Sequence, residues 1–490
     1  MPNYDSIKCP YCFKTFSHND VLFRSATALN ELDLDPTGRG ESLEEIEFSM
    51  PDGPEKSERI REYKFRESFL VREDDRYNSF WSVFGTTSET NTGVDSTILD
   101  YKRPILNPRD GLMVPRGAQL DEDDFVYKIE DAFGRESHDR VCPHCHNPLP
   151  PNYGKFPVKF ISVIGISSSG KTVFLSKLIE NIGRYAARLG MSALPASASS
   201  RKFVRDNKVD ENAPLPGGNP VEYMSQPLFY NLTYVYNNVK ENRMFVIYDI
   251  AGESCVDTKK IQNFGKFVSN SDGMLVLLDP QQFNALGGKA AGLADSVLAT
   301  LKNVYSAASM VKIPLALCIS KSDMMRQLNL LPDMCYQDVK AVDNRMFCAE
   351  EYNEISQKIA ELMALNEPEI KVALELNYKR FNYFAFSTLN CDVTIDETGR
   401  KYPERRPEPK RIEEPLYWMF KEFGFIQSDR PILDHSMIAK KIVEKKQQIS
   451  GKQAELDSLG FFAGKDKKRL KEEIGQLEAE LNELVRSQNE

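Results

Sequence analysis

The sequence predicts an α/β fold: a mostly parallel sheet covered by helices on both faces, with a cysteine-rich unit before it and a helical hairpin after it. Three observations predict this organisation. Short apolar runs alternate with helical stretches over residues 156–430, two Cys-Pro-x-Cys pairs lie within residues 1–155, and apolar residues follow a heptad-like spacing over residues 436–490. A chain of 490 residues has room for two or three domains.

The sequence argues against three classes of protein: membrane-spanning proteins, secreted proteins, and proteins that bind nucleic acid or anionic lipid through their overall charge. No apolar run approaches the roughly 20 residues that a helix needs to cross a bilayer. The first residues, Met-Pro-Asn-Tyr-Asp-Ser, lack the basic and apolar regions of a signal peptide, which predicts a cytoplasmic protein. The formal net charge of -9 gives no general attraction for nucleic acid or anionic lipid, so a nucleic-acid partner is not favoured.

Four of the nine cysteines form two knuckles, Cys9-Pro-Tyr-Cys12 and Cys142-Pro-His-Cys145. Their four thiolates would complete a tetrahedral Zn²⁺ site if the two segments meet in space, with the residues between them forming an insertion. A redox pair is the alternative, but neither knuckle lies between a strand and a helix. His144 and His146 are alternative ligands, although four thiolates already close the site. The other cysteines are scattered singly, which indicates reduced thiols: Cys255, Cys318, Cys335, Cys348 and Cys391.

The first unit, residues 1–155, begins and ends with these knuckles. Residues 125–130, the turn 131–134 and the return toward Val141 predict a hairpin that leads into the second knuckle. Residues 25–120 are acidic, rich in turn residues and weakly periodic, which predicts loops or disorder in parts of this segment. Those parts are residues 35–41 and 86–96. Residues 65–83 carry aromatic side chains, including Trp81, and are expected to fold as a small patch.

The octapeptide Gly165-Ile-Ser-Ser-Ser-Gly-Lys-Thr172 lies between the apolar run 158–164 and a predicted amphipathic helix over 171–189. It fits G-x-x-x-x-G-K-[ST], in which glycines let successive backbone N–H groups converge on a phosphate. Lys171 would reach the β and γ phosphates, and the Thr172 hydroxyl would ligate Mg²⁺. A turn that binds nothing is disfavoured, because all four signature positions are filled. The predicted phosphate-binding residues are Gly165, Ser167, Ser168, Ser169, Gly170, Lys171, Thr172 and Val173.

The rest of the sheet is predicted from short apolar runs and turn signals. Residues 228–235 and 244–250, with a tight connection over 237–242, predict a hairpin and therefore one antiparallel edge strand. Further buried strands are expected at 273–278, 315–319 and 382–386, and helices at about 291–309, 349–365 and 412–423. Ligands of such sheets bind beyond the carboxyl ends of the strands.

Two strand ends carry residues that would complete a nucleotide site. In Asp249-Ile-Ala-Gly252-Glu253, the Asp would hold Mg²⁺ through water and the Gly252 N–H would face the γ-phosphate. In Ser320-Lys-Ser-Asp323, the carboxylate of Asp323 would accept hydrogen bonds from guanine N1–H and from the exocyclic amine, a pair of donors that adenine lacks. The stem of Lys321 would lie along the base, and Ser387 and Thr388 would complete the pocket through backbone contacts.

Over residues 156–430 these segments resemble the TRAFAC-class, Ras-like branch of P-loop NTPases, with GISSSGKT, DIAGE, SKSD and FSTLN in the order of that family. The knuckles, the long first switch region, residues 411–420 and the coiled-coil tail are similar, more narrowly, to bacterial double-GTPase-type proteins of conflict systems. The resemblance implies a Mg²⁺-dependent GTP/GDP switch whose two loops order around the γ-phosphate and relax after hydrolysis.

Two residues depart from the family pattern. Ser320 replaces the usual Asn or Thr, which alters the bonds that brace the loop, and Glu253 replaces the Gln that orients the attacking water. A carboxylate there repels the γ-phosphate but can also accept a proton, so we expect hydrolysis to be slow or differently organised. The switch hydroxyl that should reach Mg²⁺ is Ser225 or Thr233. An arginine finger would come from Arg201, from Arg205 or from a partner.

Apolar residues at heptad-like spacing predict two helices of a coiled-coil hairpin, interrupted at residues 460–464. They are Ile442, Ile449, Leu456, Leu459, Leu470, Ile474, Leu477, Leu481 and Leu484. The hairpin is either a solvated arm without chemistry or an arm for partner contact or self-association. Three functions therefore stay open: a GTP-hydrolysing switch that meets a protein partner through the zinc ribbon or the arm, a GTP-gated scaffold that does not hydrolyse, and a zinc-ribbon nucleic-acid-binding protein regulated by its NTPase domain.

Overall fold

The computed structural model describes residues 4–84, 100–165, 169–217, 226–236, 238–251, 265–283, 312–340, 346–458 and 464–489. The chain divides into two compact units. Unit 1 consists of Met1–Phe160, Met191–Asn207 and Asn219–Ile250, and unit 2 of Ile161–Gly190, Lys208–Gly218 and Ala251–Glu490. The chain therefore passes between the two units several times. The helix predicted at 291–309 lies outside the described residues.

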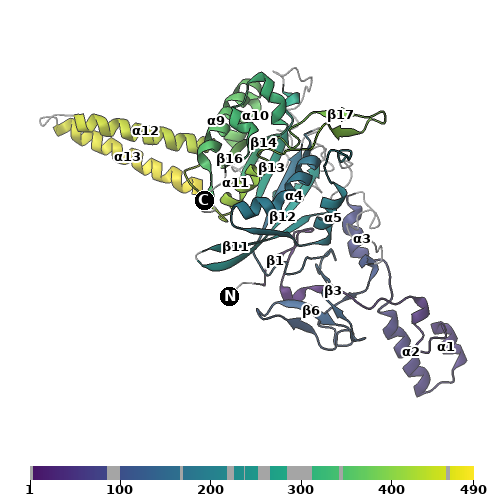
Figure 1. The fold of residues 1–490 in the computed structure, drawn as a ribbon. Helices are drawn as coiled ribbons and strands as arrows, with labels where there is room; N and C mark the ends of the chain where they lie inside the picture. Colours follow the sequence, from purple (N-terminus) through teal and green to yellow (C-terminus); the bar gives the residue numbers. More distant parts are fainter. Residues whose placement is uncertain are drawn as a thin grey trace. The chain divides into compact units, whose positions relative to one another are not determined.

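A seven-stranded sheet has the strand order β10-β11-β12-β9-β13-β14-β16 (Figure 1). Its members are β9 (Val158–Gly165), β10 (Ser192–Pro195), β11 (Leu228–Tyr236), β12 (Val239–Ala251), β13 (Gly273–Leu278), β14 (Leu315–Ile319) and β16 (Phe381–Ala385). Parallel pairing joins β9 to β13, β13 to β14 and β14 to β16. Every residue of β13, β14 and β16 is buried, as expected for parallel strands covered on both faces. The predicted α/β class is confirmed.

The antiparallel part of the sheet differs from the prediction in its detail. β11 pairs antiparallel with β12, so the predicted hairpin is present, but β12 already begins at Val239 and the connection is shorter than 237–242. β10 pairs antiparallel with the other side of β11, which makes β11 the second strand rather than the edge strand. The four residues of β10 were too few to show periodicity. Their physical role is to cover the hydrogen-bonding side that a nine-residue edge strand would expose.

The helices that accompany the sheet in the described part of unit 2 include α4 (Lys171–Arg188), α9 (Ala349–Asn366), α10 (Pro368–Asn377) and α11 (Glu414–Glu422). The predicted positions of α4, α9 and α11 are confirmed. A buried charge cluster links α9 to α11. The Arg411 guanidinium donates to Glu351 on α9, at 3.0 Å, and to Glu414 on α11. Two short strand pairs complete the unit: β15 (Met346–Phe347) with β19 (Gln427–Ser428), and β17 (Val393–Ile395) with β18 (Lys401–Pro403).

The N-terminal part of unit 1 is built from small sheets. The strands are β1 (Ile7–Lys8) paired with β2 (Thr15–Phe16), then β4 (Ile105–Leu106), β3 (Leu22–Arg24) and β8 (Arg140–Val141) in one sheet, and β5 (Ala118–Leu120), β6 (Val126–Glu130) and β7 (Glu136–Ser137) in another. Antiparallel pairing of β6 with β7 confirms the predicted hairpin. Residues 35–41 form a loop held by the buried Asp35, whose carboxylate accepts from the N–H groups of Thr37 and Arg39.

The segment between the knuckles also contains helices that the sequence did not predict, α1 (Leu43–Ser49), α2 (Pro54–Glu67) and α3 (Asp75–Ser82), and α5 (Ala198–Asp206) follows later. No described residue of α2 is buried, which explains why its apolar periodicity was weak. The expected aromatic patch is confirmed, because the buried Trp81 of α3 packs edge-on against Phe80, with ring centroids 5.0 Å apart. Residues 86–96 lie outside the described residues.

Two long helices end the chain, α12 (Met437–Ser458) and α13 (Gly464–Asn489), and they lie side by side as the predicted hairpin (Figure 1). Ile442, Leu470 and Ile474 are buried in its seam. We refer to this hairpin as the arm. Among the helices that the structure describes, none combines the length and the apolar character needed to cross a membrane.

Candidate nucleotide-binding site and cysteine cluster

The phosphate loop begins where β9 ends, at Gly165, where an added side chain would force its neighbours to shift. A Cβ atom on Gly165 would lie 2.5 Å from Ser169 Oγ and 2.6 Å from Lys171 Cβ. Gly170 has φ +73°, in the left-handed region that favours glycine, and it immediately precedes α4. The first turn of α4 contains no acidic side chain, so the partial positive charge of the helix N-terminus is not neutralised there. This arrangement suits an anion.

The other residues of the loop fit the same interpretation. The Ser169 hydroxyl is buried and has no hydrogen-bond partner among the described residues. Such a group costs roughly 1–3 kcal/mol, and a phosphate oxygen held in the loop would satisfy it. Thr172 is also buried, as a metal-binding hydroxyl at the helix start would be, while Lys171 and Val173 are half-buried. Ser167 and Ser168 lie outside the described residues.

The predicted base-binding loop is tied to the neighbouring strand through Ser320. Its backbone N–H and its hydroxyl both donate to the carbonyl oxygen of Leu278, at 2.9 and 2.8 Å. The serine therefore braces the loop to the end of β13. Lys321 follows with φ +52°, and the Ser322 N–H donates to the carbonyl oxygen of Phe386 at 3.1 Å, which ties the loop to the end of β16 as well.

Lys321 lies against the phosphate loop. Its Cε atom is 3.8 Å from the position that a Cβ on Gly170 would occupy, and its Nζ forms an ion pair with Asp279 Oδ2 at 2.6 Å. Asp279 is buried, directly follows β13, and accepts from the N–H of Gln281 at the start of the 3-10 helix η4 (Pro280–Gln282). Asp279 was not among the residues predicted from the sequence. An aspartate directly after a buried strand was the signal that could have found it.

Asp323 is held in a mostly buried environment beside Ser387. Burial raises the pKa of the Asp323 carboxyl group, although a hydrogen bond from the Ser387 side chain lowers it in part. Ser387 is itself fixed by backbone hydrogen bonds with Lys410, at 3.0 and 2.8 Å, and its hydroxyl accepts from the N–H of Asn390. Thr388 beside it is buried. Unit 2 thus brings together Gly170, Lys321, Asp323 and Ser387, the residues that the sequence predicts to lie around the base.

The residues predicted to bind Mg²⁺ or to form the switches do not all lie together in the described structure. Asp249 is buried near the end of β12, and Gly252 and Glu253 lie outside the described residues. Thr233 pairs with Asn242 across the hairpin and donates to its side chain at 2.9 Å. Asn242 precedes Asp249 by seven residues on β12, which at about 3.4 Å per residue is about 24 Å.

This distance argues against Thr233 as the hydroxyl that shares Mg²⁺ with Asp249, and Ser225 lies outside the described residues. Arg201 and Arg205 are both exposed on α5, and Arg205 pairs with Asp206 at 3.2 Å. The arginine finger stays a prediction.

The four knuckle cysteines lie together in unit 1. Their Sγ atoms all lie within 4.8 Å of one another, with Cys9 3.7 Å from Cys145 and Cys12 3.8 Å from Cys142. A tetrahedral site with Zn–S bonds of about 2.3 Å has S–S edges of about 3.8 Å, whereas a disulfide bond is only about 2.05 Å long. The spacing therefore fits a metal site. The intervening residues do form an insertion that lets the two knuckles meet.

The histidines near the cluster are engaged elsewhere. His146 Nδ1 lies 2.9 Å from the carboxylate of Asp74, and His144 Nε2 lies 3.3 Å from the carbonyl oxygen of Thr15. Backbone N–H groups instead point at the sulfurs, since Tyr11 donates to Cys9 Sγ and His144 to Cys142 Sγ, both at 3.4 Å. Four thiolates are thus the ligand set that the geometry favours.

The first knuckle packs on the strands of unit 1. The buried Tyr248 hydroxyl donates to the carbonyl oxygen of Pro10 at 2.8 Å. The ring of Phe13 lies edge-on to those of Tyr248 and Phe160, at 6.0 and 6.3 Å between centroids, and Tyr11 lies 6.3 Å from Phe229 of β11. The residue after Tyr248 is Asp249, so the cysteine cluster supports the strand that carries the predicted Mg²⁺ ligand.

The fold, the phosphate loop and the loop of Lys321 and Asp323 define this chain as a P-loop protein with a GTPase-like site. Residues 159–375 match the family Double-GTPase 2. The match covers β9 to α10, and it confirms the expected resemblance to GTPases of the double-GTPase type. It also supports GTP binding by the chain.

A curated relative from Mycolicibacterium smegmatis bears the name "Putative ESX-1 scaffolding and assembly protein SaeC". It is 22% identical over 203 residues, which are 38% of this chain and 52% of the relative. The chain thus spans about half the length of the curated relative that it matches. An association with conflict systems stays a prediction of the resemblance.

Two solved structures have similar folds over part of the chain. One is sup35 complexed with GDP, with a TM-score of 0.22 and 12% identity over 50% of this chain and 41% of that chain. The other is the GTPase-like domain of S. cerevisiae Ski7 bound to GTP, with a TM-score of 0.19 and 10% identity over 47% of this chain and 44% of that chain.

Proposed function

We propose that this chain is a Mg²⁺-dependent GTP-binding switch that hydrolyses GTP. The observation that carries the proposal is the contact of Lys321 with Gly170, because it joins the base-binding loop to the phosphate loop. Asp323 beside Ser387 then supplies the acceptor that distinguishes guanine from adenine. GTP and GDP would occupy this site in turn.

The proposed roles follow from the chemistry of each group. Lys171 and the backbone of the phosphate loop bind the β and γ phosphates, while Thr172 and Asp249 hold Mg²⁺ directly or through water. Mg²⁺ would neutralise charge on the transferred phosphoryl group. Gly252 would offer its N–H to the γ-phosphate, and Glu253 would accept a proton from the attacking water at the cost of repulsion between two anions. We therefore expect slow hydrolysis without a partner.

Replacing the Asp323 carboxylate by an amide tests whether this residue selects guanine. Asp323→Asn should shift preference from GTP to xanthosine triphosphate in a binding titration, because xanthine offers a carbonyl where guanine has its amine. The loss for GTP should be about tenfold or more, as expected when a buried polar partner is left unmatched. Lys171→Ala should abolish binding of both nucleotides. Unchanged discrimination in Asp323→Asn would show that this loop does not read the base.

A GTP-gated scaffold that does not hydrolyse GTP is the second candidate. The name of the curated relative, a scaffolding and assembly protein, favours it, as does the carboxylate at Glu253. Single-turnover phosphate release from bound GTP separates the two functions. A switch that hydrolyses GTP should release about one phosphate per bound nucleotide, whereas a scaffold would retain intact GTP over the same time. A Glu253→Gln variant with faster release would assign the slow rate to this carboxylate.

We also propose that the four cysteines hold a structural zinc ion, which the knuckle geometry and the S–S spacing support. Elemental analysis of the full chain should give about one zinc per chain. A Cys9→Ser/Cys142→Ser double variant should lose it, while Cys391→Ser, at a cysteine outside the cluster, should keep it. Full retention of zinc in the double variant would exclude this site.

A further inference from the structure

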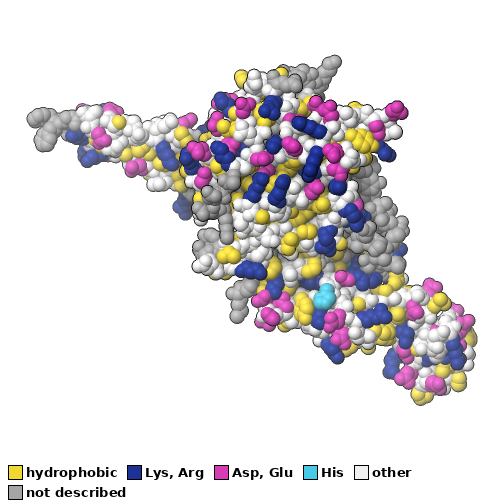
Figure 2. Space-filling view, in the orientation of Figure 1, with side chains coloured by type: hydrophobic (Ala, Val, Ile, Leu, Met, Phe, Trp, Pro, Cys, Tyr) yellow, Lys and Arg dark blue, Asp and Glu magenta, His cyan; other side chains and the backbone are white. Residues whose placement is uncertain are grey.

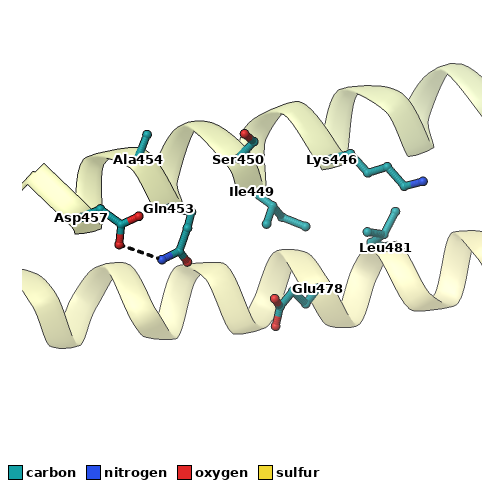
Figure 3. Close-up of a pocket in the computed structure, with 8 residues that line it drawn as sticks. All are labelled: Lys446, Ile449, Ser450, Gln453, Ala454, Asp457, Glu478 and Leu481. Carbon is teal, nitrogen blue, oxygen red and sulfur yellow. Dashed lines mark hydrogen bonds between the residues drawn. The ribbon is translucent and has the colours of Figure 1, made fainter.

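The arm has one flank closed by ion pairs and one flank open. On the closed flank, Lys445 of α12 pairs with Glu480 of α13, and Lys452 pairs with Glu473. The open flank is a groove between the helices, into which Ile449 and Leu481 point (Figure 3). Both side chains are only half-buried, although they belong to the apolar heptad positions. A two-helix hairpin cannot cover both flanks of its own seam.

The two halves of α13 carry opposite charges. Residues 464–471 contain five basic side chains and one acidic one, whereas residues 472–483 contain five acidic side chains and no basic one. Basic and acidic side chains are both visible along the arm (Figure 2). A helix charged in this way complements a second copy of itself that runs antiparallel, because each basic half then meets an acidic half.

The heptad register places the matching residues on the open flank. With Leu470, Leu477 and Leu484 in the seam, Glu473 and Glu480 face the closed flank, and Lys471 and Glu478 fall on the opposite side. Both of these side chains are exposed, and Glu478 lines the groove. No ion pair joins Lys471 or Glu478 to another residue in the part of the chain that the structure describes.

A small residue lies midway between the two charges. Gly475 is one turn from both Lys471 and Glu478, and a Cβ built on it would meet no atom within 4 Å. Glycine in a helix interior costs about 1 kcal/mol relative to alanine. Open space at this glycine lets a second backbone approach closely. Two antiparallel α13 helices that cross here would place Lys471 of each copy opposite Glu478 of the other.

We propose that the open flank of the arm binds a second copy of this chain, with the two α13 helices antiparallel and crossing at Gly475. The contact is isologous, as a twofold dimer requires, and it covers Ile449 and Leu481 of each arm. It does not rest on the proposed function, because none of these residues belongs to the nucleotide site. The dimer should therefore form with and without GTP.

Charge reversal in the full chain tests the proposal. The unaltered protein should show a concentration-dependent dimer by light scattering and sedimentation, and the dimer should weaken as salt rises. Lys471→Glu and Glu478→Lys each replace two attractive contacts by two repulsive ones, so each should weaken dimerisation by roughly tenfold or more. A 1:1 mixture of the two variants should restore dimerisation, because both contacts between positions 471 and 478 in the mixed dimer again join a lysine to a glutamate.

Glu444→Lys is the matched control, since it makes the same charge change at an exposed position of α12 away from the groove. Circular dichroism checks that the arm stays helical in every variant. A protein that is monomeric at all concentrations would overturn the proposal, as would a dimer that neither reversal weakens. Failure of the mixture to restore the dimer would exclude the antiparallel pairing. A basic surface used for nucleic acid would instead give salt-sensitive RNA or DNA binding by a monomer.

Discussion

At the scale of single residues, the site depends on backbone conformations that few side chains permit. Gly165 cannot carry a Cβ because Ser169 and Lys171 already fill that space. Lys321 takes a left-handed conformation that is unusual outside glycine and asparagine, and its ion pair with Asp279 holds the side chain over the phosphate loop. Asp279 is therefore a positioning residue in the proposed site, acting on nucleotide through Lys321.

Gly165→Ala tests the tight turn. The added methyl group would lie less than 3 Å from Ser169 Oγ and from Lys171, so the loop must shift, and its binding of a phosphate should weaken. We expect GDP and GTP affinity to fall by about tenfold or more in a fluorescence titration. The control is Gly451→Ala in α12, where a Cβ meets nothing within 4 Å. It should leave affinity unchanged and stabilise the helix by up to about 1 kcal/mol. Full nucleotide affinity in Gly165→Ala would exclude the proposed cradle.

The proposed role of Asp323 predicts that guanine nucleotides bind less tightly in acid. Burial raises the pKa of its carboxyl group, and the carboxylate must be ionised to accept both guanine donors. As the pH falls toward that raised pKa, the group takes up a proton and affinity for GDP should decrease. In Asp323→Asn the same pH range should produce no such decrease for xanthosine diphosphate. Titrations from neutral pH down to the onset of acid unfolding measure the difference. A GDP affinity of the unaltered protein that falls no earlier than the xanthosine diphosphate affinity of Asp323→Asn would contradict the assignment.

At the scale of elements, the contact between the first knuckle and β12 joins the cysteine cluster to the strand of Asp249. Tyr248 and Phe13 form this contact with aromatic surface and one buried hydrogen bond. Because the knuckle is held by thiolates rather than by a large core of its own, its position should depend on the metal. Strands β11 and β12 would then lose part of their cover when the metal is removed.

Tyr248→Phe tests whether the first knuckle and β12 stabilise each other. Removing the hydroxyl leaves the Pro10 carbonyl without its partner and should destabilise the protein by about 1–2 kcal/mol in chemical denaturation. It should also speed the transfer of zinc to a colorimetric chelator. Tyr230→Phe is the matched control, because the buried Tyr230 hydroxyl has no hydrogen-bond partner among the described groups.

Hydrogen exchange gives a second measurement of the contact between the first knuckle and β12. Chelation in the unaltered protein should increase exchange in β11 and β12 and leave β14 and β16 protected. Equal zinc release from both tyrosine variants, with unchanged exchange, would show that the knuckle and the strands are independent.

At the scale of the whole molecule, unit 2 contains the residues of the proposed base pocket, the sheet strands β13, β14 and β16, and the arm. His435, just before α12, lies buried where the chain enters the arm. Its Nε2 lies 2.9 Å from Ser356 Oγ on α9, and its ring lies 5.1 Å from that of Tyr383 on β16. This histidine therefore connects the entry of the arm to the sheet.

The stability of the protein should fall in mild acid because of His435. Burial, with a smaller effect of Lys440 and Lys371 opposed by Glu375, lowers the pKa of His435 to about 4. The unfolded chain, with a histidine pKa near 6.5, therefore binds one more proton than the native state between about pH 6.5 and about pH 4. Stability should decrease by at most about 1.4 kcal/mol per pH unit as the pH falls through this window. His435→Gln, which cannot titrate, should show a shallower decrease in denaturant midpoint. Identical slopes in the two proteins would exclude His435 as the cause.

The sequence by itself determined the parts of the structure that depend on interactions between residues close together in the chain. The phosphate loop, the strands at 273–278 and 315–319 and the heptads of the arm could be predicted because glycine turns, apolar runs and helical periodicity act over a few residues. The four cysteines were recognisable as candidate ligands from their pairing in two knuckles. Helices α1, α2 and α3 could not be predicted, since α2 in particular buries none of its described side chains.

Only the tertiary structure decided which distant residues meet. It brought the two knuckles together across the long insertion, placed Lys321 between Asp279 and Gly170, and set Thr233 far along the hairpin from Asp249. It also added β10 outside β11 and left one flank of the arm open. Each of these depends on strand order, register or helix packing, and those are fixed by contacts between segments far apart in the chain rather than by the spacing of residues within one segment.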